Sequence, residues 1–177
     1  MPTLGRLSRH RERAVQSIQE DMNHFRAQLQ RGSIHKAYRA LLGYMMDLRT
    51  HFKKKYPKYS VSGLYQGYLD MSYFALVPPS FKRRGLKIAI VFNYDAFRFE
   101  AWLSGTNRQV LLKYWGLVRD ARWPEYRLVP PGTWADSIIE YDLADSFDFS
   151  DLRSLTAAIE KKVAKFTNDV ERFLSRR

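Results

Sequence analysis

Arg98, Glu100 and Trp102 are the residues whose types and spacing suggest chemistry most directly. They sit at alternate positions, and alternate side chains along a β-strand point to the same face of a sheet. An arginine there could donate two parallel hydrogen bonds to an anionic group, and a tryptophan ring could stack on a flat one. A glutamate could accept hydrogen bonds, or act as a general acid or base if burial shifts its pKa. The segment therefore predicts a polar binding site on one sheet face.

This segment is the second half of a predicted hairpin. Apolar runs over 86–92 and 97–103 flank a loop at 93–96. Pairing Phe92 with Phe97 then places three further pairs on the polar face: Val91 with Arg98, Ala89 with Glu100, and Lys87 with Trp102. The opposite face is predicted to form the core, with Leu86, Ile88, Ile90, Phe92, Phe97, Phe99, Ala101 and Leu103.

A further strand is predicted over 65–74, where residues alternate in polarity. If it lies beside the hairpin, its even-numbered residues join the polar face. The predicted ligand-binding residues are then Gln66, Tyr68, Asp70, Lys87, Arg98, Glu100 and Trp102. The alternative is a half-exposed face of cross-strand charge pairs with a Lys–Trp contact, which binds nothing.

An enzyme is a second hypothesis, with Asp70 or Glu100 as acid or base. Carboxylates on neighbouring strands invite comparison with the restriction-endonuclease-like fold, which uses an Asp and a Glu-x-Lys motif. Here Trp102 stands where that motif has its lysine, so the catalytic set is incomplete, and a likeness of fold is weak evidence for function. We predict no cofactor and no metal site, because phosphate-loop motifs and cysteine are absent and no histidines have metal-ligand spacing.

The elements around the hairpin predict an α+β fold. Apolar stripes at helical spacing over 12–31 and from Ser33 to about Pro57 indicate an N-terminal helical hairpin, broken at Gly32. A helix is expected after the turn at 104–107, then two short strands over 126–129 and 137–143, and a long C-terminal helix that Ser150 caps. We therefore predict a mainly antiparallel sheet of about five strands with helices on one face. The domain is expected over 12–177, after a basic flexible extension over 1–11.

Positive charge is concentrated at the front of the chain. The net charge is +12, and residues 1–58 hold 13 Lys and Arg against 4 Asp and Glu. Nucleic-acid binding is therefore a third hypothesis. It would use the basic side chains of the helical region, namely Arg9, Arg11, Arg13, Arg26, Arg31, Lys36, Arg39, Lys53, Lys54 and Lys55. The alternative is a solvated helix surface that keeps the protein in solution.

Partners and compartment follow from the same patterns. The chain has no apolar run of the roughly 20 residues that span a bilayer, so we expect no membrane insertion and a cytoplasmic protein. The stripe of the C-terminal helix could pack in a homodimer or, more simply, in the core of one chain. The remaining expected partner is a small anionic ligand at the polar face.

Several segments resemble a small uncharacterised bacterial family. They are Met46–Arg49 with Phe52–Lys53, then Lys55–Pro57, Ser62–Met71, Leu86–Phe92, Arg98–Leu103 and Asp136–Glu140. The resemblance is to a domain-of-unknown-function family of the 7000 series and covers about 23–174. It implies a single bacterial cytoplasmic domain. It implies no activity, cofactor or catalytic residue.

Overall fold

The computed structural model describes residues 4–132, 136–144 and 146–176, and their side chains from Ser17 onward. Two long helices come first, α1 (Leu4–Gln30) and α2 (Ser33–Lys55). Gly32 separates them with a left-handed φ of 76°, as predicted for a residue that ends a helix. The chain divides into two compact units between Gly43 and Tyr44, inside α2, and the strands belong to the second unit. No helix in the described ranges is long and apolar enough to cross a bilayer.

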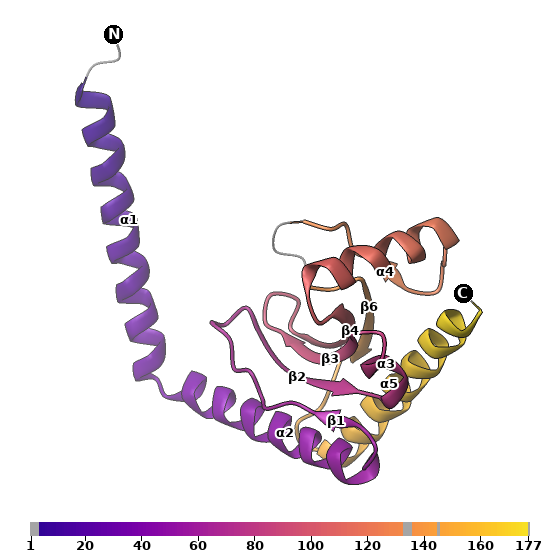
Figure 1. The fold of residues 1–177 in the computed structure, drawn as a ribbon. Helices are drawn as coiled ribbons and strands as arrows, with labels where there is room; N and C mark the ends of the chain where they lie inside the picture. Colours follow the sequence, from indigo (N-terminus) through magenta and orange to yellow (C-terminus); the bar gives the residue numbers. More distant parts are fainter. Residues whose placement is uncertain (1–3, 133–135, 145, 177) are drawn as a thin grey trace. The chain divides into compact units, whose positions relative to one another are not determined.

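The second unit is built on a six-stranded antiparallel sheet, one strand more than predicted. The strands lie in the order β1-β2-β3-β4-β6-β5 (Figure 1). They are β1 (Ser60–Val61), β2 (Met71–Val77), β3 (Leu86–Asn93), β4 (Arg98–Gly105), β5 (Arg127–Leu128) and β6 (Ile139–Ala144). The additional strand is β1, whose two residues are too few to show an alternating pattern.

One face of this sheet forms the core, as the alternation predicted. Ile88, Ile90 and Phe99 are fully buried on it. The second half of α2 packs there, with the Phe52 ring 6.2 Å from that of Phe74. The last helix, α5 (Leu152–Ser175), covers the β6 side, where the ring of Phe166 stacks on Tyr141. The apolar stripe of α5 is therefore used inside one chain.

Two shorter helices complete the unit. The four-residue helix α3 (Pro79–Lys82) begins at Pro79, because proline suits the first helical position, and Pro78 is its N-cap residue. The helix α4 (Arg108–Ala121) follows the predicted turn, and Asn107 caps it by accepting the backbone N–H of Val110. Figure 1 shows α4 on the side of the sheet opposite α5. The cap of α5 is Asp151, where Ser150 was predicted.

A buried carboxylate fixes α5 to the β5 edge. Asp169 is 7% exposed and accepts a hydrogen bond of 2.6 Å from the hydroxyl of Tyr126. It also pairs with Lys165 and Arg172 on its own helix. Burial would raise the pKa of Asp169, but the hydrogen bonds from Lys165 and Tyr126 outweigh it and leave the pKa below its usual range. Burial, and next the hydrogen bond to Asp169, raise the pKa of Tyr126, while the contact with Lys165 acts in the opposite direction.

Candidate functional site

The predicted polar face exists, but the hairpin register on it differs from the prediction by two residues. Glu100 lies opposite Val91 and Trp102 opposite Ala89, where Arg98 and Glu100 were expected. The sides of the strands are unchanged, because a shift of two residues keeps every side chain on its face. Lys87, expected opposite Trp102, lies opposite Ser104.

The turn explains the shift. The side-chain oxygen of Asn93 accepts the backbone N–H of Ala96, and Phe97 has a left-handed φ of 49°. Phe97 therefore leaves the strand, and its ring is 62% exposed at the loop. The loop runs over 94–97 in place of 93–96, and Asn93 pairs with Arg98.

Glu100 is the centre of a buried polar cluster on this face. Its side chain is 0% exposed. It accepts hydrogen bonds of 2.6 Å from Nε of Arg98 and 2.7 Å from Nε1 of Trp102, and a longer one of 3.5 Å from Asn93. Both carboxylate oxygens are thus engaged. The cluster holds Arg98 and Trp102 in place, and this is a positioning role.

Arg98 is committed to carboxylates of the protein itself. Besides Glu100, its guanidinium lies 3.3 Å from Asp142 on β6. The hydrogen bond to Glu100 and the nearby negative charges raise the pKa of Arg98 further. Asp142 lies opposite Glu100 in the sheet, so β6 extends the polar face.

A second buried carboxylate, Glu140, lies opposite Trp102 on β6. It is 9% exposed and accepts hydrogen bonds from Ser137 and Arg127. Sequence reasoning missed this part of the face. The alternation of Ile139, Tyr141 and Leu143 was visible, but nothing local indicated that β6 pairs with β4.

The predicted strand over 65–74 is wrong in its first half. Residues 65–70 form a loop that meets β2 through a single bridge between Tyr65 and Tyr73. Gly67 and Leu69 both have positive φ, of 67° and 66°, which no strand allows. The loop returns the chain onto β2, and β2 begins at Met71.

This loop removes three predicted residues from the polar face. Asp70 folds back to accept the backbone N–H groups of Tyr68 and Met71, and these bonds lower its pKa. Tyr68 is 89% exposed, and Gln66 belongs to the same loop. Ser72 pairs with Phe92 on the core face, so the odd-numbered Met71 and Tyr73 lie on the polar face instead.

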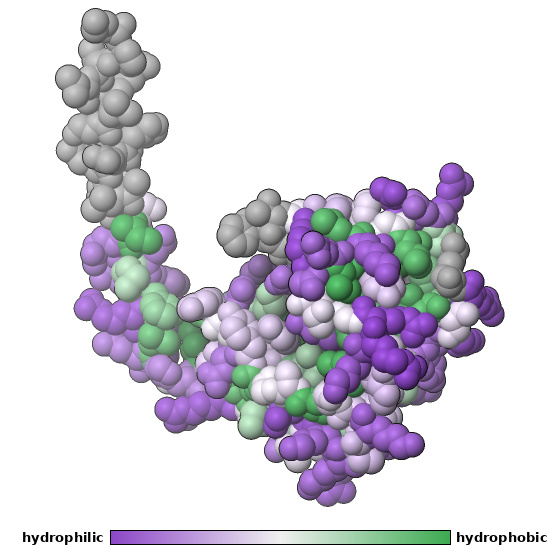
Figure 2. All heavy atoms as spheres, in the orientation of Figure 1, coloured by the Kyte–Doolittle hydropathy of each residue, from purple (hydrophilic) through white to green (hydrophobic). Residues whose placement is uncertain are grey.

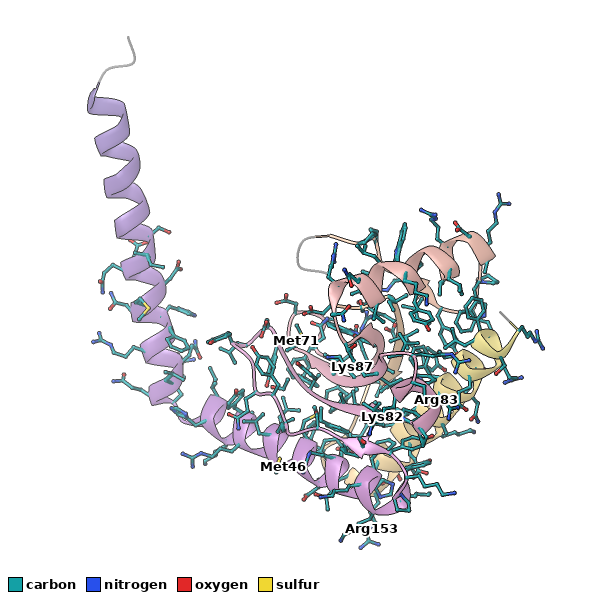
Figure 3. The ribbon with its side chains drawn as sticks, in the orientation of Figure 1. Met46, Met71, Lys82, Arg83, Lys87 and Arg153 are labelled. Atoms are coloured by element: carbon teal, nitrogen blue, oxygen red, sulfur yellow. The ribbon has the colours of Figure 1, made fainter. Side chains whose placement is uncertain are left out.

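A pocket of about 300 Å³ lies on the polar face, where the sheet meets the start of α4. Lys87 and Trp102, both predicted, line it. Its lining also includes Met71, Tyr73, Ser104, Arg108 and Asp136. Figure 3 labels Met71 and Lys87, which lie on β2 and β3 beside this pocket.

The start of α4 is held close against β4. A Cβ on Gly105 would lie 2.6 Å from the backbone nitrogen of Leu111, closer than the Cβ atoms of folded proteins approach such an atom, so glycine is needed there. This close approach brings Arg108 to the rim of the pocket. The signal that could have indicated it is the cap at Asn107, since the residue after a cap starts the helix.

The pocket combines opposite charges with an aromatic wall. Lys87 and Arg108 supply two positive charges and Asp136 one negative charge. The ammonium of Lys87 lies 6.0 Å from the centre of the Tyr73 ring. The indole of Trp102 is fixed in orientation by its hydrogen bond to Glu100. Such a site can hold a ligand that carries an anionic group next to a flat ring.

In the described part of the chain, this geometry does not bring together the residues that a metal site or a nuclease site would use. Among the residues that the structure describes, no group of three or more His, Asp or Glu could hold a metal ion. Asp70 lies in a loop, and Trp102 donates to Glu100 where the nuclease motif would have a lysine.

The basic side chains of the nucleic-acid hypothesis are mostly exposed where they are described. They are Arg26, Arg31, Lys36 and Arg39, with Lys53, Lys54 and Lys55 at the end of α2. Lys55 differs, because its ammonium lies 2.6 Å from Glu160 on α5. The side chains of Arg9, Arg11 and Arg13 lie outside the described residues.

The model of one protein family matches residues 18–174, which is most of the chain. This family is a domain of unknown function, DUF7000. The chain belongs to the DUF7000 family. The match confirms the resemblance seen in the sequence and begins slightly before residue 23. No curated protein matches the chain, and no solved structure matches it either. Membership of DUF7000 therefore adds no ligand or activity.

Proposed function

We propose that this domain is a non-enzymatic binding module that holds a small anionic ligand in the polar-face pocket. The observation that carries the proposal is the pairing of two cations, Lys87 and Arg108, with the fixed indole of Trp102 around one hollow. A volume of about 300 Å³ is at the lower end of the range for small-molecule sites. The compartment we propose for this binding is the bacterial cytoplasm.

The charge of the ligand would be met by Lys87 and Arg108. The sequence suggested Arg98 for this role, but Arg98 already donates to Glu100 and contacts Asp142. Its part in the proposal is to hold Glu100, which in turn orients Trp102. A ring whose orientation is already set loses little entropy when a flat ligand stacks on it.

Binding is favoured over catalysis by the state of the carboxylates. Glu100 has donors on both oxygens and does not line the pocket. Asp70 has a lowered pKa, so it is a poor base, and it is tied to its own loop. Asp136 lines the pocket but is exposed to solvent.

A thermal-shift screen tests the proposal. The compounds are nucleotides, phosphorylated and carboxylated metabolites, divalent metals and short DNA and RNA, each at low and moderate salt. A ligand that binds the folded state raises the melting temperature by mass action. We expect a small anion to give a shift that survives moderate salt. The shift should disappear in Lys87→Ala and remain in Lys82→Ala, which removes the same charge from an exposed position on α3. A shift equal in both variants would contradict the proposal.

Nucleic-acid binding is the second candidate, and one observation favours it. Lys53 and Lys54 are exposed in the last turn of α2, next to each other in a strongly basic part of the sequence. Binding of this kind weakens steeply with salt, because bound phosphates release counterions. Affinity for DNA or RNA that falls with salt, and falls again in a Lys53→Ala, Lys54→Ala variant but not in Lys87→Ala, would move the function to the helices.

A further inference from the structure

We infer that α1 pairs with α1 of a second copy of this chain, as a short parallel coiled coil over residues 15–29. The inference is independent of the pocket. It starts from an apolar stripe on α1. Ile18, Met22 and Phe25 are 57%, 55% and 47% exposed. Figure 2 shows hydrophobic residues along one side of the described part of this helix.

The spacing of the stripe is that of a coiled-coil seam. The apolar residues Val15, Ile18, Met22, Phe25 and Leu29 follow one another at intervals of three, four, three and four. This is the heptad pattern in which each seam residue inserts between residues of a facing helix. The seam does not extend further toward the N-terminus, because the preceding a and d positions hold the polar residues Ser8 and Arg11. A seam of two heptads gives a weak pair that forms as concentration rises.

The charges beside the seam fit a parallel copy. With Val15 and Met22 at position a, Asp21 is at position g and Arg26 at position e of the next heptad. In a parallel pair these two positions meet across the interface. Asp21 of each chain would therefore face Arg26 of the other, which gives two equivalent ion pairs. Among the described residues Asp21 has no ion pair, and Arg26 reaches only Asn23 at 3.5 Å.

The helix itself needs such a partner. Between Ser17 and Ala27 every described side chain of α1 is exposed. Helices in water gain most of their stability from packing of an apolar face, and a lone helix is marginal. Pairing of two stripes would supply that packing.

Cysteine cross-linking tests the geometry, because the chain has no cysteine of its own. Ile18→Cys and Phe25→Cys place a thiol at seam positions one heptad apart. In a parallel pair each residue faces its own copy, so each variant should form a covalent dimer under mild oxidation. An antiparallel pair can bring at most one of them to its axis. The control is Glu20→Cys, at the outward position f, which should remain monomeric.

Sedimentation and charge reversal test the partner. The protein should shift from monomer to dimer between about 1 µM and about 500 µM. Asp21→Arg or Arg26→Asp alone should weaken the dimer about tenfold or more, and the two together should restore it. A monomer at every concentration would overturn the inference. So would cross-linking as strong in Glu20→Cys as in the seam variants, or failure of the double reversal to restore pairing. If the stripe instead docks within one chain, Phe25→Asp would lower stability without changing mass, and the inference fails.

Discussion

Trp102 donates its indole N–H to Glu100, two residues before it on the same strand, at 2.7 Å. The carboxylate is fully buried, while the ring of Trp102 lines the pocket. One hydrogen bond therefore joins the interior of the polar face to the wall of the proposed site.

Replacing Glu100 with glutamine should destabilise the domain by about 2–4 kcal/mol. The amide cannot accept on both sides, so one donor of Arg98 or Trp102 is left buried and unpaired. Urea unfolding measures the change. The control is Asp95→Asn, which removes the same charge from the exposed hairpin loop and should change stability by less than about 0.5 kcal/mol. Equal effects of the two variants would mean that the Glu100 cluster contributes nothing specific.

Trp102→Phe keeps a ring in the pocket wall but removes the donor. We expect a loss of about 1–2 kcal/mol in the free energy of unfolding. Trp123→Phe is the matched control, because Trp123 also donates to a carboxylate two residues away, at 3.0 Å, but Glu125 is exposed. Since water replaces that bond, the control should cost less. A larger cost at Trp123 would contradict the importance assigned to burial.

Gly67→Ala should strongly disturb the loop that ends at β2. A Cβ there would lie 1.9 Å from the carbonyl oxygen of Met71, and the φ of 67° is strained for alanine in any case. We expect a loss of about 2 kcal/mol or more. Gly63→Ala is the control, since nothing lies within 4 Å of its added Cβ and its φ is not in the left-handed region. It should be neutral to within about 1 kcal/mol. Similar unfolding curves for both variants would argue against this loop conformation.

Asp169 predicts a defined loss of stability in acid. Its pKa is lowered in the folded state, so its contribution is complete above the usual pKa of an aspartate, near pH 4, and is lost as pH falls through the lowered value. Asp169→Asn should therefore cost about 1–2 kcal/mol at pH 7, a modest figure because Lys165 and Arg172 are largely exposed. The difference in the free energy of unfolding between wild type and Asp169→Asn should therefore become smaller below about pH 4.

Urea unfolding of both proteins at several pH values checks this. The control is Asp47→Asn, which removes one negative charge from an exposed part of α2 and should change the free energy of unfolding at pH 7 by less than about 0.5 kcal/mol. If the difference in the free energy of unfolding between wild type and Asp169→Asn stays constant down to about pH 2.5, the ionised carboxylate of Asp169 does not stabilise the fold.

Much of the fold could be predicted because it depends on local periodicity. Alternation at two residues identified both faces of β3 and β4, and spacing at three and four residues identified α2, α4 and α5. The buried Ile90 and Phe99, and the stripe that includes Phe166, lie where those patterns placed them. Even the wrong hairpin register kept Glu100 and Trp102 on the correct side, because an error of two residues preserves the face.

The site was predicted only in part, since its composition depends on single backbone conformations and on distant pairings. Phe97, Gly67 and Leu69 adopt positive φ, and nothing in the alternation of 65–74 signals such a turn at a leucine. Those turns moved the register and removed Asp70 from the face. The predicted Lys87 and Trp102 remain in the pocket.

The sequence by itself determined which residues share a face or a helical side, because neighbours two, three or four positions apart are placed by backbone geometry alone. Only the tertiary structure decided which faces meet. It paired β6 with β4, brought Asp142 to Arg98, and set Arg108 beside the pocket through the close approach of Gly105 to Leu111. The first two of these contacts join residues far apart in the chain, and the free energy of all three depends on packing and burial that no local pattern records.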